Sequence, residues 1–439
     1  MSAITQTMLD SFSKAYNADP MNKVRQNAVV KGGLLAAAEN QQAVIDNPMQ
    51  FSIEIESGKI TNQKASGRCW LFAALNTMRF EIMQKLNLET FELSQNYQMF
   101  WDKFEKANYF LDSIIKTANE DVDSRLVKHL LEAPMQDGGQ WDMVCALADK
   151  YGCVPKYAMP ETFHSSNTRE MCHLLTLKLR EDALHLRNVV QNGGDTEAMK
   201  QDMLSEIYRM LCICLGEPPK TFDFEYRDKD KKFYRDAGLT PRAFFEKYVG
   251  MALDDYLSII NAPTADKPYG RTFTVDYLGN VVGGRAVKYL NLPAAELKRL
   301  AIAQLSDGKP VWFGCDVGQL LLRDTGIMAM NSYGFESLLD VKFNLDKAQR
   351  LDYSESMMTH AMVFLGVNLV DGVPNRWKVE NSWGDKSGQE GYYIMSDAWF
   401  DEYNYQVVVN KKYLTDEQRA MFEQEPIVLK PWDPMGSLA

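Results

Sequence analysis

The sequence predicts an α+β fold, in which a helical first half and a β-rich last third flank a large helical insertion. Apolar residues recur at helical spacing in the first half, whereas short runs rich in valine, tyrosine and phenylalanine gather after residue 310. The 439 residues are 46% hydrophobic and 24% charged, which is enough apolar material for a substantial core. Helices that come first and strands that follow are typical of α+β proteins.

Apolar periodicity marks the helices of the first half. The strongest helix is expected over 68–86, directly after Ser66-Gly67, because leucine, methionine and isoleucine recur there every three or four residues. A short run at 51–55 alternates apolar and polar residues and favours a strand. Further helical segments are expected at 7–16, 33–45, 94–117 and 140–151.

After residue 167 the expected secondary structure changes from helices to strands, and then to an extended tail. Residues 168–260 are charge-rich and favour helices, whereas strands are expected at 311–317, 360–369, 376–381 and 391–395. Three prolines after residue 425 favour an extended tail. The predicted divisions are an N-terminal arm (1–60), a helical lobe (61–167), a mainly helical insertion (168–290), a β-rich lobe (291–425) and a C-terminal tail (426–439).

Composition narrows the class of protein. The net charge of −11 disfavours a general nucleic-acid or anionic-membrane surface. No apolar run of about 18 residues appears, and the N-terminus lacks the pattern of a secretory signal. Seven cysteines, an odd number without disulfide-framework spacing, indicate free thiols in a reducing cytoplasm. Neither a metal nor a cofactor motif stands out, so we expect neither group.

Cys69 is the candidate nucleophile. A turn of small residues delivers it to the start of the 68–86 helix, where free backbone N–H groups and the helix dipole favour negative charge. A lowered thiol pKa is therefore expected, and the thiolate is the reactive form. Gln63 lies across the turn, so its side-chain amide and the Cys69 backbone N–H are expected to form an oxyanion hole.

Two later segments supply partners for the thiol. His360 begins an apolar strand, and Asn381 ends another strand before Ser382-Trp383-Gly384. If these strands are antiparallel neighbours, the histidine and the asparagine lie side by side. A cysteine beside a histidine that a third polar group orients is the general arrangement for an activated thiol. We expect Trp383 to shield the histidine–asparagine hydrogen bond from solvent.

In combination these motifs resemble the papain-like cysteine peptidases, and within them the bleomycin hydrolase and aminopeptidase C group. The spacing of 360 − 69 = 291 residues between Cys69 and His360 is about twice that of small papain-like enzymes, and Arg68 stands where they have serine or alanine. The matching motifs are Gln63…Cys69-Trp70, Leu93-Ser94-Gln95-Asn96-Tyr97, Gly138-Gly139, His360-Ala361 and Asn381-Ser382-Trp383-Gly384.

The resemblance implies a two-lobed papain-like fold and a thiol aminopeptidase that releases N-terminal residues from peptides. It also implies a homohexamer whose active sites face a central cavity. Gly138 and Gly139 are expected to offer backbone groups to an extended substrate. A tail that enters the active site would place the Ala439 carboxylate near the substrate ammonium, as its partner.

Two other functions remain compatible with the residues alone. A Cys-His-Asn amidase or acyltransferase would use the same acyl-enzyme and differ only in the acceptor. A non-catalytic assembly protein on a peptidase fold is the other alternative. The presence of Gln63, Cys69, His360 and Asn381 together argues against that last reading, because a protein without catalysis has no need of all four.

Overall fold

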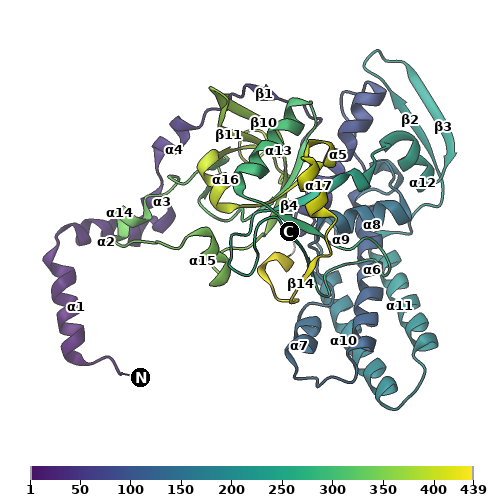
Figure 1. Ribbon diagram of the computed structural model, residues 1–439, viewed down its shortest axis with the longest axis horizontal. Helices are drawn as coiled ribbons and strands as arrows, with labels where there is room; N and C mark the ends of the chain where they lie inside the picture. The colour runs from purple at the N-terminus through teal and green to yellow at the C-terminus, as the bar shows by residue number, and fades with distance from the viewer. Residues whose placement is uncertain (1, 438–439) are drawn as a thin grey trace.

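A twelve-stranded mixed sheet organises the second half of the chain in the computed structural model, which describes residues 2–437 (Figure 1). The sheet order is β14-β5-β6-β4-β13-β7-β10-β11-β12-β9-β8, and β1 pairs with β10. The strands are β1 (Ile53–Glu54), β4 (Tyr256–Ile260), β5 (Thr272–Val275), β6 (Tyr289–Asn291), β7 (Val311–Cys315), β8 (Leu321–Leu322), β9 (Ile327–Met328), β10 (His360–Val370), β11 (Val373–Glu380), β12 (Tyr392–Ser396), β13 (Asn404–Asn410) and β14 (Ile427–Leu429).

The expected helices of the first half are present. The helix α5 (Cys69–Leu86) is the central one, since thirteen of its eighteen residues are buried, and it packs against β10. The expected strands of the last third are β7, β10, β11 and β12. The other helices are α6 (Gln95–Lys116), α7 (Arg125–Glu132), α8 (Trp141–Tyr151), α9 (Phe163–Ser166), α10 (Arg169–Gln191), α11 (Glu197–Leu215), α12 (Pro241–Phe244), α13 (Ala294–Ser306), α14 (Phe335–Leu339), α15 (Lys347–Asp352), α16 (Asp397–Tyr403) and α17 (Asp416–Phe422).

The segment between 168 and 290 is less helical than expected. Only α10 and α11 are long helices; residues 222–239 form the hairpin of β2 (Phe222–Arg227) and β3 (Phe233–Leu239), which projects at one end of the molecule (Figure 1). The high charge of this segment favoured a helical prediction, although aromatic and polar residues alternate strictly along β2, as expected for a strand. The strands β4, β5 and β6 also begin before residue 291, so the large sheet begins earlier than the expected β-rich lobe.

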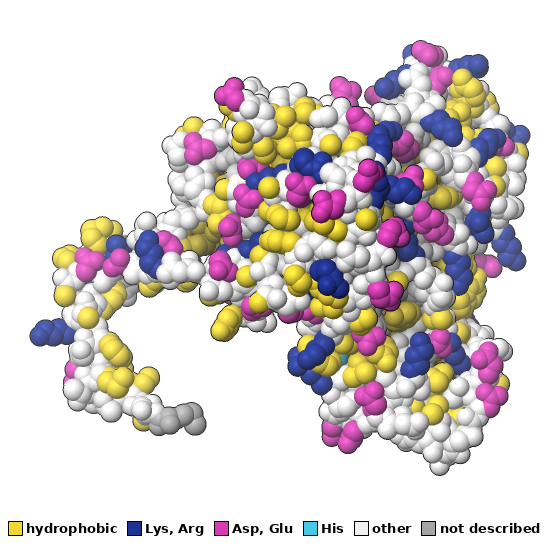
Figure 2. Space-filling model, viewed as in Figure 1, with side chains coloured by type: hydrophobic (Ala, Val, Ile, Leu, Met, Phe, Trp, Pro, Cys, Tyr) yellow, Lys and Arg dark blue, Asp and Glu magenta, His cyan; other side chains and the backbone are white. Residues whose placement is uncertain are grey.

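The N-terminal arm extends away from the rest of the chain. It consists of α1 (Gln6–Ala18), α2 (Met21–Gly32), α3 (Leu34–Ala38) and α4 (Gln41–Asp46), and Figure 1 shows the first two helices well outside the body. No residue of α1 or α2 is buried, and hydrophobic side chains line the arm in Figure 2. Within residues 2–437, no helix combines the length and the apolar character needed to cross a bilayer.

Candidate active site

Cys69 is the first residue of α5 and lies at the junction between that helix and the sheet. Its side chain is 2% exposed. Backbone N–H groups of Ala361, Trp70 and Cys69 itself donate hydrogen bonds to the Cys69 sulfur. The sulfur therefore lies next to the first residues of β10. The helix start and the beginning of β10 therefore converge, although 291 residues (360 − 69) separate them in sequence.

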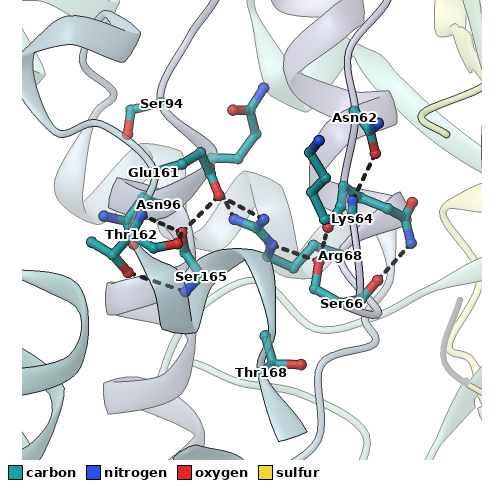
Figure 3. A network of polar contacts seen from close by, with 12 residues as sticks. Asn62, Lys64, Ser66, Arg68, Ser94, Asn96, Glu161, Thr162, Ser165 and Thr168 are labelled. Carbon is teal, nitrogen blue, oxygen red and sulfur yellow. Dashed lines mark hydrogen bonds and ion pairs between the residues drawn. The ribbon is translucent and has the colours of Figure 1, made fainter. Parts of the chain in front are cut away.

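Arg68 stands where small papain-like enzymes have serine or alanine, and its buried contacts account for this difference. Its guanidinium is 1% exposed and forms two hydrogen bonds of 3.1 and 2.8 Å with the carboxylate of Glu161 (Figure 3). Its Nε donates to the Ser66 hydroxyl at 2.9 Å, within the same turn. Ser165 in turn donates to Glu161, so the segment leading into α10 holds the turn that carries Cys69.

His360 and Asn381 meet as the strand pairing predicts. The first residue of β10 and the residue after β11 approach with 2.9 Å between His360 Nε2 and Asn381 Oδ1. The Ser382 backbone N–H also donates to this Oδ1, at 2.8 Å. Because an amide oxygen only accepts, Nε2 carries the hydrogen of the neutral imidazole and Nδ1 keeps a free lone pair.

Trp383 covers one side of this pair. Its ring centroid lies 4.9 Å from that of His360, with the rings inclined by 37°. Both members of the hydrogen bond are buried, with exposed fractions of 4% for His360 and 1% for Asn381. These contacts are compatible with the expected shielding role of the tryptophan.

Gln63 points its amide nitrogen toward the turn that carries the nucleophile. Its Oε1 accepts a 2.7 Å hydrogen bond from the Ser382 hydroxyl, and its Nε2 donates to the Ser66 carbonyl at 2.6 Å. One N–H of the amide is therefore used within the turn, and the second has no partner among residues 2–437. The Ser382 contact determines which end of the amide faces the site, a role that the sequence analysis did not assign.

The Gly138-Gly139 turn is held against the nucleophile turn by Asp137. Its carboxylate accepts from the Gly67 N–H at 2.9 Å and pairs with Lys103 at 2.7 Å. Burial opposes ionisation of Asp137, but the Lys103 ammonium and the hydrogen bonds from Lys103, Thr168 and Gly67 together outweigh it and keep the pKa of this carboxyl below its usual value. A Cβ on Gly139 would lie 2.5 Å from the Trp70 ring, so the turn requires glycine there. Substrate binding by this turn stays a prediction.

The C-terminal tail runs from the sheet toward this turn. After β14, the Met435 carbonyl accepts from Tyr289, and the Ser437 carbonyl accepts a 2.7 Å hydrogen bond from Gln140 Nε2. Gln140 directly follows Gly139, so the last described residues lie beside the Gly138-Gly139 turn. The tail also borders a cavity of about 460 Å³ next to α6 and α7. The predicted role of Ala439 falls outside the described residues.

Burial governs the ionisation of the two reactive groups. It raises the pKa of the Cys69 thiol to about 11, against the opposing effect of the three backbone N–H groups. It lowers the pKa of His360 to about 4; the hydrogen bond with Asn381 opposes this shift and the charge of Arg323 adds to it. The expected lowering of the thiol pKa by the helix start is therefore wrong, because desolvation of a thiolate at this depth exceeds the stabilisation by N–H dipoles.

Comparison with known proteins identifies the family. The model of the Peptidase C1-like family matches residues 3–436. Aminopeptidase C of Listeria innocua is 54% identical and that of Streptococcus thermophilus 53%, with at least 99% of each chain covered. The crystal structure of PepW from Lactobacillus rhamnosis matches with a TM-score of 0.99 and 55% identity over 100% of both chains.

These comparisons confirm several of the predictions made from sequence. The resemblance to the aminopeptidase C group, the papain-like α+β fold and the thiol aminopeptidase activity are confirmed, which favours the first of the three functions considered. With a family model that spans residues 3–436 and relatives more than half identical over almost their whole length, the chain belongs to the Peptidase C1-like family.

Proposed function

We propose that Cys69, His360 and Asn381 are the catalytic group of this thiol aminopeptidase. The observation that carries the proposal is the 2.9 Å hydrogen bond from His360 Nε2 to Asn381, made where β10 begins beside the start of α5. It leaves the Nδ1 lone pair to take the proton of the Cys69 thiol. A thiolate or an imidazolium alone is disfavoured by burial, whereas proton transfer within the pair forms both charges together, and their attraction opposes that cost.

The reaction then follows in two stages. The Cys69 sulfur attacks the scissile carbonyl, and the oxyanion accepts hydrogen bonds from the free N–H of Gln63 and from the Cys69 backbone. His360 gives its proton to the departing amine, and a thioester remains on Cys69. Water then loses a proton to His360 and attacks the thioester, which releases the amino acid and restores the thiol.

The tail accounts for removal of single N-terminal residues. A cleft open at both ends would cut internal bonds, whereas a tail segment at Gln140 would block the side of the cleft that holds residues preceding the cleaved bond. The contact of Gln140 with the Ser437 carbonyl supports this proposal, and Ala439 is two residues further along the sequence. We infer that the Ala439 carboxylate meets the substrate ammonium there as a charge-assisted partner.

Matched substrates test the proposed function. An aminoacyl fluorogenic amide should be hydrolysed by the purified protein, and its N-acetylated form should be hydrolysed at least about 10-fold more slowly, since it lacks the charge that the tail recognises. Iodoacetamide should abolish both activities, because the thiolate is the nucleophile. Equal rates on the two substrates would contradict the aminopeptidase mechanism, and full activity after alkylation would contradict the thiol mechanism.

We also propose assembly into a homohexamer in a reducing cytoplasm. The N-terminal arm supports the assembly: Phe12 and Val24 are each 58% exposed and Val30 is 78% exposed, an apolar surface that a second copy of the chain would cover. The insertion at 168–290 supplies further surface outside the catalytic lobes. All seven cysteines are free thiols, which supports the reducing compartment.

Removal of α1 and α2 should break the assembly without unfolding the chain. Light scattering of the intact protein should give six copies of 50.1 kDa, about 301 kDa. Deletion of residues 2–32 should give smaller species with a melting temperature close to that of the intact protein, because no residue of these helices is buried in the chain's own body. A monomer at micromolar concentration for the intact chain would contradict the hexamer.

A further inference from the structure

Arg323 carries a free positive charge at the edge of the candidate active site. It lies in the hairpin between β8 and β9 and is exposed. Its guanidinium carbon lies 4.8 Å from the centroid of the Trp383 ring. Among residues 2–437 the guanidinium has no hydrogen-bond or ion-pair partner, and the neighbouring Asp324 carboxylate does not pair with it.

The charge is close enough to affect catalysis. Trp383 contacts both the guanidinium and the imidazole, with 4.9 Å from its centroid to that of His360. The guanidinium is therefore no farther from the imidazole than the sum of these two distances. A cation here disfavours the imidazolium that the mechanism needs, in line with its lowering effect on the pKa of His360. An anion bound beside Arg323 would remove this penalty.

In the proposed mechanism Arg323 would lie on the side of the leaving group, because it contacts Trp383, which packs against His360. His360 protonates the departing amine, so the part of the peptide beyond the cleaved bond must run past the histidine and Trp383. The tail contacts Gln140 instead, beside Gly139, which in the proposed function is the side of the amino-terminal residue. Because an extended chain advances about 3.3–3.6 Å per residue, a carboxylate one or two residues beyond the cleaved bond reaches the guanidinium.

We propose that Arg323 binds the C-terminal carboxylate of dipeptide and tripeptide substrates. The stack on Trp383 holds the planar guanidinium in place and leaves its N–H edges free to bind a carboxylate in a two-point contact. The inference rests on the proposed function and extends it, since the tail would recognise one end of a short peptide and Arg323 the other. The site would then favour short peptides with a free carboxylate over their amides.

The test compares a dipeptide with its C-terminal amide. We would measure kcat and KM for leucyl-glycine and leucyl-glycinamide with the intact protein, with Arg323→Met, which keeps the apolar stem over Trp383, and with Arg323→Lys. The ratio of kcat/KM for acid over amide should fall about 10-fold in Arg323→Met, mainly through KM of the acid. Arg323→Lys should retain part of the preference. Lys386→Met, which removes another exposed cation three residues after Trp383, should leave the ratio unchanged.

The ratio also separates the possible failures. An unchanged ratio in Arg323→Met would overturn the inference, whether both rates fall together or neither falls. A ratio that changes only because kcat for the amide rises would also overturn it, since that result reports the effect of the charge on His360 and not binding of the carboxylate. If the intact protein hydrolyses neither compound, the proposed function itself fails. Thermal melting of Arg323→Met should match the intact protein, since the side chain is exposed.

Discussion

Replacement of Cys69 by alanine should lower kcat by roughly 10⁴-fold or more, because loss of a nucleophile leaves only the residual rate that binding and the oxyanion hole support. The fold should persist: the change removes one sulfur atom from a buried position, and the free energy of unfolding should fall by about 1 kcal/mol. Steady-state assays with an aminoacyl amide and chemical denaturation measure the two effects separately.

Cys212 provides the matched control for this change. It is a half-buried thiol on α11, outside the proposed catalytic group. Cys212→Ala should retain full activity and full sensitivity to iodoacetamide, and peptide mapping of the inactivated protein should find the label on Cys69. A Cys69→Ala protein with normal turnover of any peptide would exclude this residue as the nucleophile.

Deletion of residues 436–439 should change the bond that the enzyme cleaves. Met435 stays anchored by burial and by Tyr289, while the segment that reaches Gln140 is lost. Without the terminal carboxylate, kcat/KM for a free aminoacyl amide should fall by about 10- to 100-fold, the range of a charge-assisted hydrogen bond. N-acetylated and internal peptide bonds should become substrates, because the side of the cleft that the tail is proposed to block would be open.

Ser437→Ala is the control for the deletion. Gln140 binds the Ser437 backbone carbonyl and the hydroxyl makes no hydrogen bond within the described residues, so this substitution should preserve the preference for a free N-terminus. Product analysis by mass spectrometry distinguishes stepwise trimming from internal cleavage. If the truncated enzyme still requires a free amine and works at unchanged rates, the tail has no part in specificity.

The regular elements of the fold were largely predictable because their periodicity is local. The helix expected over 68–86 is α5, and the strand expected over 360–369 is β10, which starts at His360 and extends to Val370. The hairpin of β2 and β3 was missed since charged residues dominate its sequence. The early strands β4 to β6 were missed because their partners, such as β13, lie far along the chain, and sequence patterns do not report such pairings.

The candidate site was predictable where a motif combines residue type with position in an element. Cys69 begins a helix, His360 begins a strand, and Asn381 follows one, so the pairing of two strands was enough to bring the last two together. Ser382 and Gln140 could also have been predicted from the sequence, because each adjoins a predicted site residue. Arg323 was not, since nothing in its local sequence distinguishes it from any other exposed arginine.

The sequence by itself determined the candidate reactive side chains. These are a thiol at a helix start, a histidine and an asparagine at the ends of strands, and the Gln63 amide in the turn before the helix. Tertiary structure decided how deeply that chemistry is buried. Burial reverses the expected direction of the Cys69 pKa, and distant contacts such as Arg68 with Glu161 hold the turn. Desolvation and long-range contacts depend on which segments pack together, whereas residue type and periodicity are properties of the local chain.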